Sequence, residues 1–188
     1  MREGMSINRD EIRVTKTEDR YLADFNLELE NIGAKKILDI GAGDSADFVR
    51  YCLEHGIKGI YGLDARPLSS EASEDSPDIK DHYVRGELEH LPFKPATFDL
   101  ILMRAVINPE TDVNVEGALS QTLETLSPGG ELMIYPVWRE KEERVKIDQA
   151  LLKLDHDKFS WHWQEKEILP VQGKELHKDL LVIKKQIL

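Results

Sequence analysis

Residues 36–45 read KILDIGAGDS, and this stretch decides the fold. Its first half is a short apolar run of the kind that forms a buried strand, and the glycines after it allow a tight turn. Gly41 and Gly43 also let a ligand approach the backbone, because no Cβ stands in the way. The amide groups that open the next helix would add a positive end. The stretch therefore predicts a strand, a turn that can hold a ligand, and a helix.

The alternation of strands and helices continues on both sides of this stretch. Apolar residues at helical spacing predict one helix over residues 18–31, ended by Gly33. Residues 66–80 are acidic and rich in serine and proline, which predicts a loop or a short, weak helix. Further helices are expected over 45–55, 115–126 and 139–154, and further strands over 59–64, 82–85, 98–103, 131–135, 159–168 and 176–184.

This order of elements predicts the fold class. Strands that alternate with helices pair in parallel through right-handed crossovers, and two consecutive strands at the end of the chain imply an antiparallel edge. We expect an α/β fold: a three-layer, doubly wound, mostly parallel sheet of about seven strands with an antiparallel C-terminal edge. In such sheets ligands bind beyond the carboxyl ends of the strands, where the strand order reverses.

The chain shows no internal repeat and no linker rich in proline, glycine or serine. We therefore expect a single domain over residues 1–188. Its parts are an N-terminal helical extension over 1–31, a ligand-binding core over 36–135, and a C-terminal helix and strand pair over 136–188.

Composition and charge narrow the class of protein. The formal charge of −11 repels phosphate backbones, so a nucleic-acid substrate is not expected. One cysteine, Cys52, allows no internal disulfide. No apolar run approaches the roughly 20 residues that span a bilayer, and residues 1–10 lack the apolar core of a signal peptide. We expect a cytoplasmic protein without membrane contact. The histidines and the cysteine show no metal-ligand spacing, so no metal is expected.

Three further segments accompany the glycine turn. Asp64 ends the second strand, and its distance from Gly43 is that expected of a nucleoside-binding unit, in which the carboxylate accepts hydrogen bonds from ribose hydroxyls. An acid at a strand end can also simply cap the following turn. Residues 86–93 read GELEHLPF, and residues 126–132 read LSPGGEL, where a helix stop leads directly into a strand.

Taken together, these segments resemble the class I S-adenosylmethionine-dependent methyltransferases. Residues 38–43 are similar to the family's first motif and residues 62–64 to its second. Residues 86–93 resemble the family's G-D-A-x-x-L-P-F stretch, and residues 126–132 resemble its L-x-P-G-G-x-L stretch. The resemblance covers residues 36–135, about half of the chain.

The resemblance implies S-adenosylmethionine as the cofactor. It places Asp39 and the glycine turn at the methionine and adenosine end, and Asp64 on the ribose hydroxyls. Glu87 would meet the adenine amino group, and the Leu88 amide a ring nitrogen. Met103–Arg104 would floor the pocket near the methionine. The implied cofactor residues are Asp39, Gly41, Gly43, Asp44, Asp64, Ala65, Glu87, Leu88, Met103 and Arg104.

Three positions depart from the family pattern. Ser45 stands where the family often has a third glycine, and we expect it to cap the following helix. Asp44 stands where a neutral residue is more usual. It either favours the positive amine or sulfonium of the cofactor or starts the helix electrostatically, and both interpretations remain open. Glu87 replaces an aspartate, so its side chain must fold back to reach adenine.

Two other classes of function are alternatives to methyl transfer. Residues 41–46 also fit the G-x-G-x-x-G/A pattern, and Asp64 could bind the ribose of NAD in an oxidoreductase. Against this, too little chain follows Tyr135 for a second nucleotide-binding half, and the Leu-Pro-Phe and Pro-Gly-Gly segments have no role there. A non-catalytic member that binds the cofactor or a partner stays open. Methyl transfer depends mainly on placement and needs no obligatory acid or base, so catalytic residues are not assigned.

The methyl acceptor is not encoded in any recognisable motif. Asn108-Pro109-Glu110, His90 and the pair Trp161 and Trp163 are weak candidates, better explained as a turn, a loop residue and core aromatics. We expect Tyr21 and its neighbours to form part of a lid over the substrate; alternatively the site is open to a larger substrate or a second subunit, as in a homodimer. Negative charge favours a small molecule or a basic protein surface.

Overall fold

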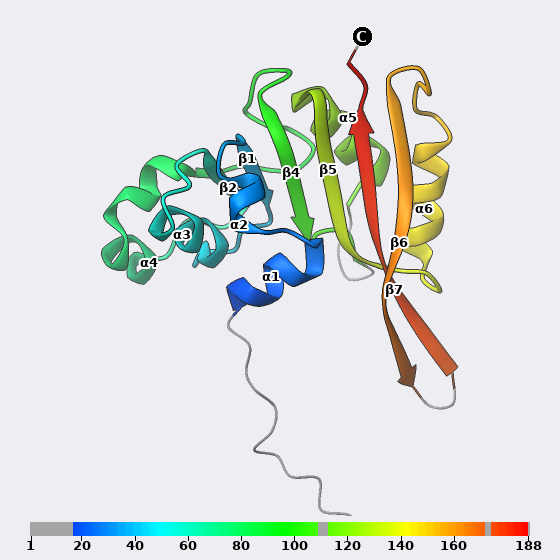
Figure 1. The fold of residues 1–188 in the computed structure, drawn as a ribbon, viewed down its shortest axis with the longest axis horizontal. Coiled ribbons are helices and arrows are strands. Elements are labelled where there is room, and N and C mark those ends of the chain that lie inside the picture. The colour runs from blue at the N-terminus through cyan, green and yellow to red at the C-terminus, as the bar shows by residue number, and fades with distance from the viewer. Residues whose placement is uncertain (1–16, 109–112, 172–173, 188) are drawn as a thin grey trace, which may run out of the picture.

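The computed structural model describes residues 17–108, 113–171 and 174–187, and Figure 1 shows its central twisted sheet. Within these residues the sheet has seven strands in the order β3-β2-β1-β4-β5-β7-β6. Neighbours among β1 to β5 pair in parallel, and β7 is antiparallel to both β5 and β6. The strands are β1 Ile37–Ile40, β2 Ile60–Asp64, β3 Tyr83–Arg85, β4 Phe98–Arg104, β5 Leu126–Trp138, β6 Phe159–Val171 and β7 Lys174–Lys185. The predicted fold is confirmed. The antiparallel strand β7 lies between β5 and the edge strand β6.

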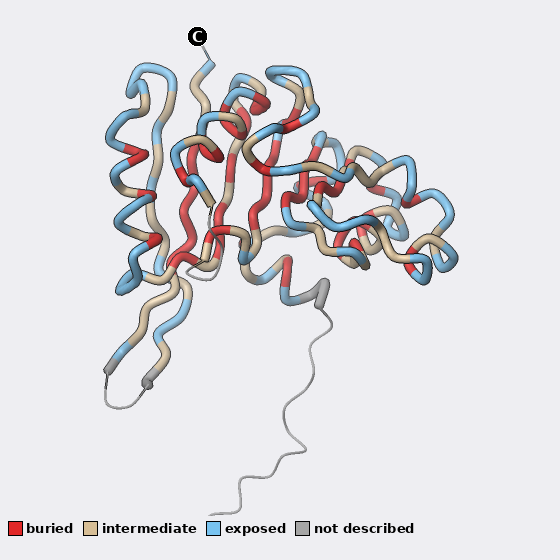
Figure 2. Tube along the Cα trace, turned by 180° about the vertical axis from the view of Figure 1, so that it is seen from behind, coloured by how far each residue is buried: buried red, intermediate tan, exposed pale blue. Residues whose placement is uncertain are grey.

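Helices cover both faces of this sheet, and none among the described residues is long and apolar enough to cross a bilayer. The α-helices are α1 Thr17–Phe25, α2 Leu29–Ile32, α3 Asp47–Glu54, α4 Ser70–Asp75, α5 Val115–Thr125 and α6 Glu142–Leu151, and η2 Pro77–His82 is a 3-10 helix. Strand alternation divides the core in two: Ile37 packs with α1 and α3, whereas Leu38 and Ile40 pack with α5 and α6. Figure 2 shows the buried residues along the strands and the inner helix faces.

The strand order reverses at β1. The chain runs outward from β1 through β2 to β3, then returns to place β4 on the other side of β1. Parallel strands flanking such a reversal leave a crevice at their carboxyl ends, because the connections leave in opposite directions. The glycine turn of residues 41–43 follows β1 directly, so the fold places it at this crevice.

The N-terminal helix is shorter than predicted. Instead of one helix over 18–31, α1 ends at Phe25 and α2 begins at Leu29. Asn26 has φ 54°, and the Leu27 amide donates to the Leu22 carbonyl at 2.8 Å, which closes the helix end. Asparagine adopts this left-handed conformation more readily than most residues. The apolar spacing continued across the break because both helices face the same core.

Two other predicted boundaries are corrected. Helix α3 begins at Asp47, and Ala46, with φ 46°, occupies the N-cap position without a side-chain cap. The prediction that Ser45 caps this helix is therefore wrong, because the turn extends one residue further than the glycine pattern suggests. Strand β5 begins at Leu126, earlier than residue 131, because Leu126 pairs with Phe98 of β4.

Helices α1 and α2 belong to the core. Tyr21, Phe25 and Ile32 are at most 7% exposed, and Tyr21 stacks on Phe48 with ring centroids 4.3 Å apart. Their apolar side chains close the face of the sheet that α3 leaves uncovered. The described part of the predicted N-terminal extension is thus packed against the core at the carboxyl ends of the strands, beside the crevice.

Candidate functional site

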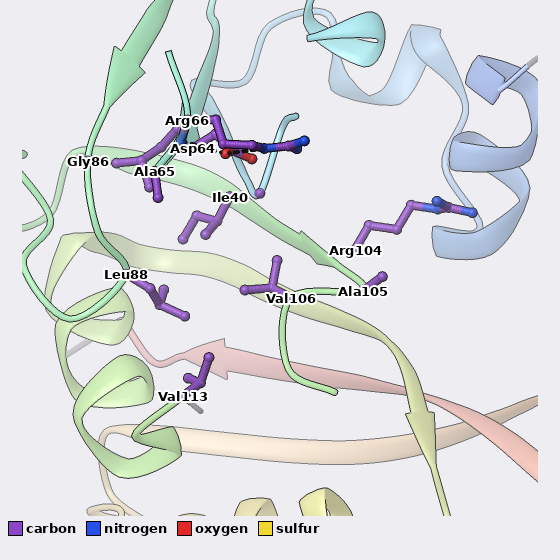
Figure 3. A pocket seen from close by; sticks show the side chains of 12 residues that line it. Ile40, Asp64, Ala65, Arg66, Gly86, Leu88, Arg104, Ala105, Val106 and Val113 are labelled. Carbon is purple, nitrogen blue, oxygen red and sulfur yellow. Dashed lines mark hydrogen bonds and ion pairs between the residues drawn. The ribbon is translucent and has the colours of Figure 1, made fainter. Parts of the chain in front are cut away.

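A cavity of about 330 Å³ lies in the crevice beyond β1, β2 and β4 (Figure 3). Its wall is mostly apolar and carries one carboxylate, that of Asp64, and two guanidinium groups. Such a mixture of apolar surface and a few polar groups is typical of small-molecule sites. The lining residues are Ile40, Gly41, Leu63, Asp64, Ala65, Arg66, Gly86, Leu88, Arg104, Ala105, Val106 and Val113.

The glycine turn has a shape that only glycine permits. Gly41 and Gly43 both have φ 77°, in the left-handed region that other residues rarely adopt. A Cβ on Gly41 would lie 2.5 Å from Cγ2 of Val106, so the turn and the loop after β4 are in close contact. The Gly41 amide donates to the Leu63 carbonyl at 2.7 Å, which ties the turn to β2. The turn is therefore fixed from both neighbouring strands.

Asp64 stands at the end of β2 with its carboxylate held in place. The Gly43 amide donates to Oδ2 at 2.9 Å, and the Arg66 amide and Nε donate to Oδ1 at 2.9 and 3.1 Å. Burial opposes ionisation, but the hydrogen bonds from Arg66 and Gly43 outweigh it and lower the pKa of Asp64. The sequence analysis left open that Asp64 simply caps the following turn, and its contact with the Arg66 amide is such a cap. Asp64 also lines the cavity.

Arg66 is a site residue that sequence reasoning missed. Its side chain is 60% exposed, contacts Asp64, and lies 3.5 Å from the carboxylate of Asp44. The available signal was its position two residues after an aspartate that ends a strand, because such an aspartate often accepts from the amide two residues on. Asp44 is thus paired with Arg66, outside the cavity lining.

Asp39 lies behind the cavity wall. Strand alternation turns it toward α1 and α3, where it is 1% exposed. The Tyr21 hydroxyl donates to its Oδ1, and no described residue donates to its Oδ2. Burial raises the pKa of Asp39 to about 7, against the opposing effects of the Tyr21 hydrogen bond and the Arg104 charge. The site therefore includes a buried carboxyl with one oxygen unsatisfied.

Arg104 connects the cavity to helix α1. Its Nε donates to Oδ2 of Asp24 at 2.8 Å, and its guanidinium lies 5.4 Å from the centroid of the Tyr21 ring. Figure 3 shows its side chain directed away from Asp64, toward the N-terminal helices. Tyr21 itself is buried beside Asp39 and does not line the cavity. The expected lid function of Tyr21 remains a prediction. Arg104, through its bond to Asp24, links α1 to the cavity wall.

The structure separates the predicted cofactor residues into three groups. Those that line the cavity are Gly41, Asp64, Ala65, Leu88 and Arg104. Those buried or bonded directly behind it are Asp39, Gly43 and Met103. Asp44 and Glu87 have exposed side chains outside the lining, so the expected contacts of these two residues would require their side chains to move. The cofactor roles of all ten stay predictions.

None of the described weak acceptor candidates lines this cavity. His90 is exposed, and Trp161 and Trp163 pack partly buried against the core, with the Arg144 guanidinium 3.4 Å from the Trp163 ring centroid. The Asn108 side chain donates to the Ala105 carbonyl at 2.9 Å, as a turn residue does. Pro109 and Glu110 lie outside the described residues.

Comparison with known proteins identifies the family. A family model described as a methyltransferase domain matches residues 38–134. The ubiquinone/menaquinone biosynthesis C-methyltransferase UbiE of Vibrio cholerae is 30% identical over 151 residues, 77% of this chain and 53% of that protein. A methyltransferase of Strobilurus tenacellus is 29% identical over 110 residues, 58% of this chain and 38% of that protein. A solved S-adenosylmethionine-dependent methyltransferase from Mesorhizobium loti superposes with a TM-score of 0.57 at 21% identity, covering 84% and 95% of the two chains.

The chain belongs to the methyltransferase domain family, because the family model matches more than half of its length. This membership implies S-adenosylmethionine as the cofactor. It also removes the motif-level argument for NAD, since the glycine turn belongs to the matched methyltransferase segment. The chain spans 38–61% of the lengths of the curated relatives that it matches.

The observed groups fit this cofactor. A carboxylate with a lowered pKa suits the two hydroxyls of a ribose, and the apolar side chains of Leu63 and Leu88 suit an adenine face. When it is ionised, Asp39 adds negative potential behind the glycine turn, which suits a ligand with an ammonium and a sulfonium group. The absence of a Cβ at Gly41 lets Val106, which also lines the cavity, pack against the glycine turn.

Proposed function

We propose that this chain methylates a small-molecule acceptor, using S-adenosylmethionine held in the cavity at the β1–β4 switch point. The observation that carries the proposal is the Asp64 carboxylate, fixed by the Gly43 amide at the edge of that cavity. When bound, the cofactor supplies an electrophilic methyl group on its sulfonium. The residues of the chain then have to bind the cofactor and the acceptor, orient them, and exclude water. These tasks are most of what in-line transfer requires.

Each part of the cavity has a binding task in this proposal. Asp64 accepts hydrogen bonds from the ribose, and its hydrogen bond from Gly43 fixes the orientation of the carboxylate before the ligand arrives. Arg66 must release Oδ1 for this contact, which its 60% exposure allows. Val106 and Val113 form the opposite, apolar wall and exclude water from the region where the acceptor would meet the methyl group.

Charge favours a small acceptor over a nucleic acid. A formal charge of −11 repels phosphate backbones and attracts cationic or neutral molecules. A basic protein surface is the alternative, because it also complements a negative surface. An acceptor screen on purified protein distinguishes them by the size of the labelled product.

Calorimetric titration of S-adenosylhomocysteine tests the proposed cofactor site. We expect the wild-type chain to bind it with a Kd of about 1–100 μM, within the range of small-molecule sites. Asp64→Asn should weaken binding about 10- to 100-fold, because it removes charge-assisted hydrogen bonds to the ribose while leaving an oxygen for the Gly43 amide. Asp78→Ala removes an exposed acid of η2 and serves as the control for net charge.

The competing functions give different results in the same titration. Binding of NADH in place of S-adenosylhomocysteine would restore the oxidoreductase alternative. If neither ligand binds, the remaining alternative is a non-catalytic protein of this fold that binds a partner. Tight binding of S-adenosylhomocysteine together with no labelled product from any acceptor class would identify a non-catalytic cofactor-binding protein.

A further inference from the structure

A second, smaller cavity adjoins the proposed cofactor cavity. Its volume is about 70 Å³, and its described lining comes from residues 107–108, from residues 113 and 115 at the start of α5, and from the first turns of α6. Val113 lines both cavities, so one side chain forms a shared wall. Figure 3 shows Val113 on the side of the cofactor cavity opposite Asp64. The residues of the smaller cavity are Ile107, Asn108, Val113, Val115, Glu142, Glu143 and Lys146.

Glu143 is the unusual member of this set. It is only 4% exposed, and neither Oε1 nor Oε2 accepts a hydrogen bond from any described residue. A buried carboxylate without partners is strongly unfavourable, so native proteins seldom keep one unless a ligand or water satisfies it. The fold of this chain nevertheless holds Glu143 against the cavity, in the first turn of α6.

Among the described residues, none forms an ion pair or a hydrogen bond with the Glu143 carboxylate. Lys146 is the ammonium group that lines the same cavity, and its Nζ forms an ion pair with Glu142 at 3.1 Å. The positive end of α6 offers partial compensation to an acid in its first turn. The other described lining residues are Asn108 and the apolar Ile107, Val113 and Val115. A cationic group entering this cavity would therefore meet a buried carboxylate whose two oxygens accept no hydrogen bond from the described residues.

We infer that Glu143 binds a positively charged nitrogen of the methyl acceptor, so that the acceptor is a small organic ammonium compound. The inference rests on the proposed function, because it places the acceptor beside the cofactor cavity. The ammonium donates to the Glu143 carboxylate, and the carbon skeleton passes the shared wall at Val113 toward the cofactor. The smaller cavity is large enough for an ammonium with its first carbons, and the net negative charge concentrates cations at the surface.

Ligand-observed NMR with n-propylammonium tests this subsite. Propan-1-ol is the neutral probe of matched size, and each probe is titrated with and without S-adenosylhomocysteine. We expect wild-type protein to bind the ammonium at least about tenfold more tightly than the alcohol, since charge-assisted hydrogen bonds are roughly twice as strong as neutral ones. Glu143→Gln should reduce this preference to about twofold or less. Asp157→Asn, which removes an exposed acid outside both cavities, should keep it.

The outcomes separate this inference from the proposed cofactor site. Loss of the preference in Glu143→Gln alone supports the subsite, whether or not S-adenosylhomocysteine binds. An equal preference in wild type and Glu143→Gln, or none in wild type, overturns it even where S-adenosylhomocysteine binds normally. A melting temperature gives a second check. Because Glu143→Gln removes an unpaired buried charge, we expect its melting temperature to equal or exceed that of wild type. A fall of several degrees would mean that the carboxylate has a structural partner, and this result would also overturn the inference.

Discussion

At the scale of single residues, the two acids of the nucleotide-binding motifs have opposite environments. Asp64 is held by hydrogen bonds that lower its pKa, whereas burial raises the pKa of Asp39 to about 7. The difference follows from strand geometry, because Asp39 lies in mid-strand facing α1 and α3 while Asp64 ends its strand at the cavity. Asp39 therefore destabilises the empty protein when it ionises, and a cationic ligand would offset that cost.

The pH dependence of stability should reveal Asp39. Its folded pKa is raised from 3.8 to about 7, so the folded state binds a proton that the unfolded state loses. Its contribution to stability is fully present below pH 3.8 and is lost as pH rises to about 7, on the order of 4 kcal/mol in total. Asp39→Asn should match wild type near pH 4 and exceed it near pH 8.

Urea denaturation at several pH values measures this difference in the free energy of unfolding. Asparagine keeps an oxygen for the Tyr21 hydroxyl, so the substitution changes charge with little change in packing. The lowered pKa of Asp64 acts in the opposite sense and only as pH falls below its usual value, so the two windows are separate. A constant difference between wild type and Asp39→Asn from pH 4 to 8 would contradict the assignment.

At the scale of elements, Asp179 of β7 fixes the start of α6. It is 1% exposed, and its carboxylate accepts from Nη2 of Arg139 at 2.7 Å and from Nη1 of Arg144 at 2.7 Å. Arg139 follows β5, Arg144 belongs to α6, and the Arg144 guanidinium lies over Trp163 of β6. The buried Asp179 carboxylate thus connects β5, β6 and β7 to the start of α6. Glu143 lies in the first turn of this helix.

Removing Asp179 should therefore destabilise the protein strongly. Asp179→Ala removes the buried acceptor that two guanidinium groups share, and the loss of these charge-assisted hydrogen bonds should cost about 2–3 kcal/mol. Glu165→Gln is the matched control, because Glu165 contacts the same Arg139 at 2.8 Å but is 44% exposed. That control should cost less than about 1 kcal/mol. Chemical denaturation compares the two variants, and similar losses in both would refute the special role of Asp179.

At the scale of the whole molecule, the proposed cofactor cavity joins segments from distant parts of the chain. Its wall takes residues from the ends of β1, β2 and β4 and from the segment before α5, and Arg104 ties it to α1. A ligand in this cavity contacts parts of the chain that separate on unfolding. Binding should therefore stabilise the fold as a whole.

Thermal unfolding with S-adenosylhomocysteine measures this coupling. At a concentration of 100 times its Kd, the ligand should add about 2.7 kcal/mol and raise the melting temperature by about 5–10 °C. The Asp64→Asn variant should show a much smaller shift at the same concentration. Equal shifts in both proteins would mean that the ligand binds somewhere other than at Asp64.

The sequence by itself determined the fold class and the location of the proposed cofactor site. Strands such as Ile37–Ile40 were predictable because a buried strand has a local apolar signature. The turn at Gly41 and Gly43 was predictable because glycine adopts a positive φ most readily, so glycines directly after a strand mark a tight turn. Asp64 was predictable for a similar reason, since its distance from the turn along the chain fixes its position at the neighbouring strand end.

Only the tertiary structure decided which other side chains surround the site. Tyr21 meets Asp39 across 18 residues, and Asp24 meets Arg104 across 80. The break at Asn26 and the unpaired burial of Glu143 likewise depend on what packs against each segment. Periodicity and spacing report on neighbours along the chain, but burial and electrostatic pairing arise between elements that the sequence order keeps apart. The cofactor motif can therefore be recognised in the sequence. The groups that we propose select the acceptor come together only in the folded chain.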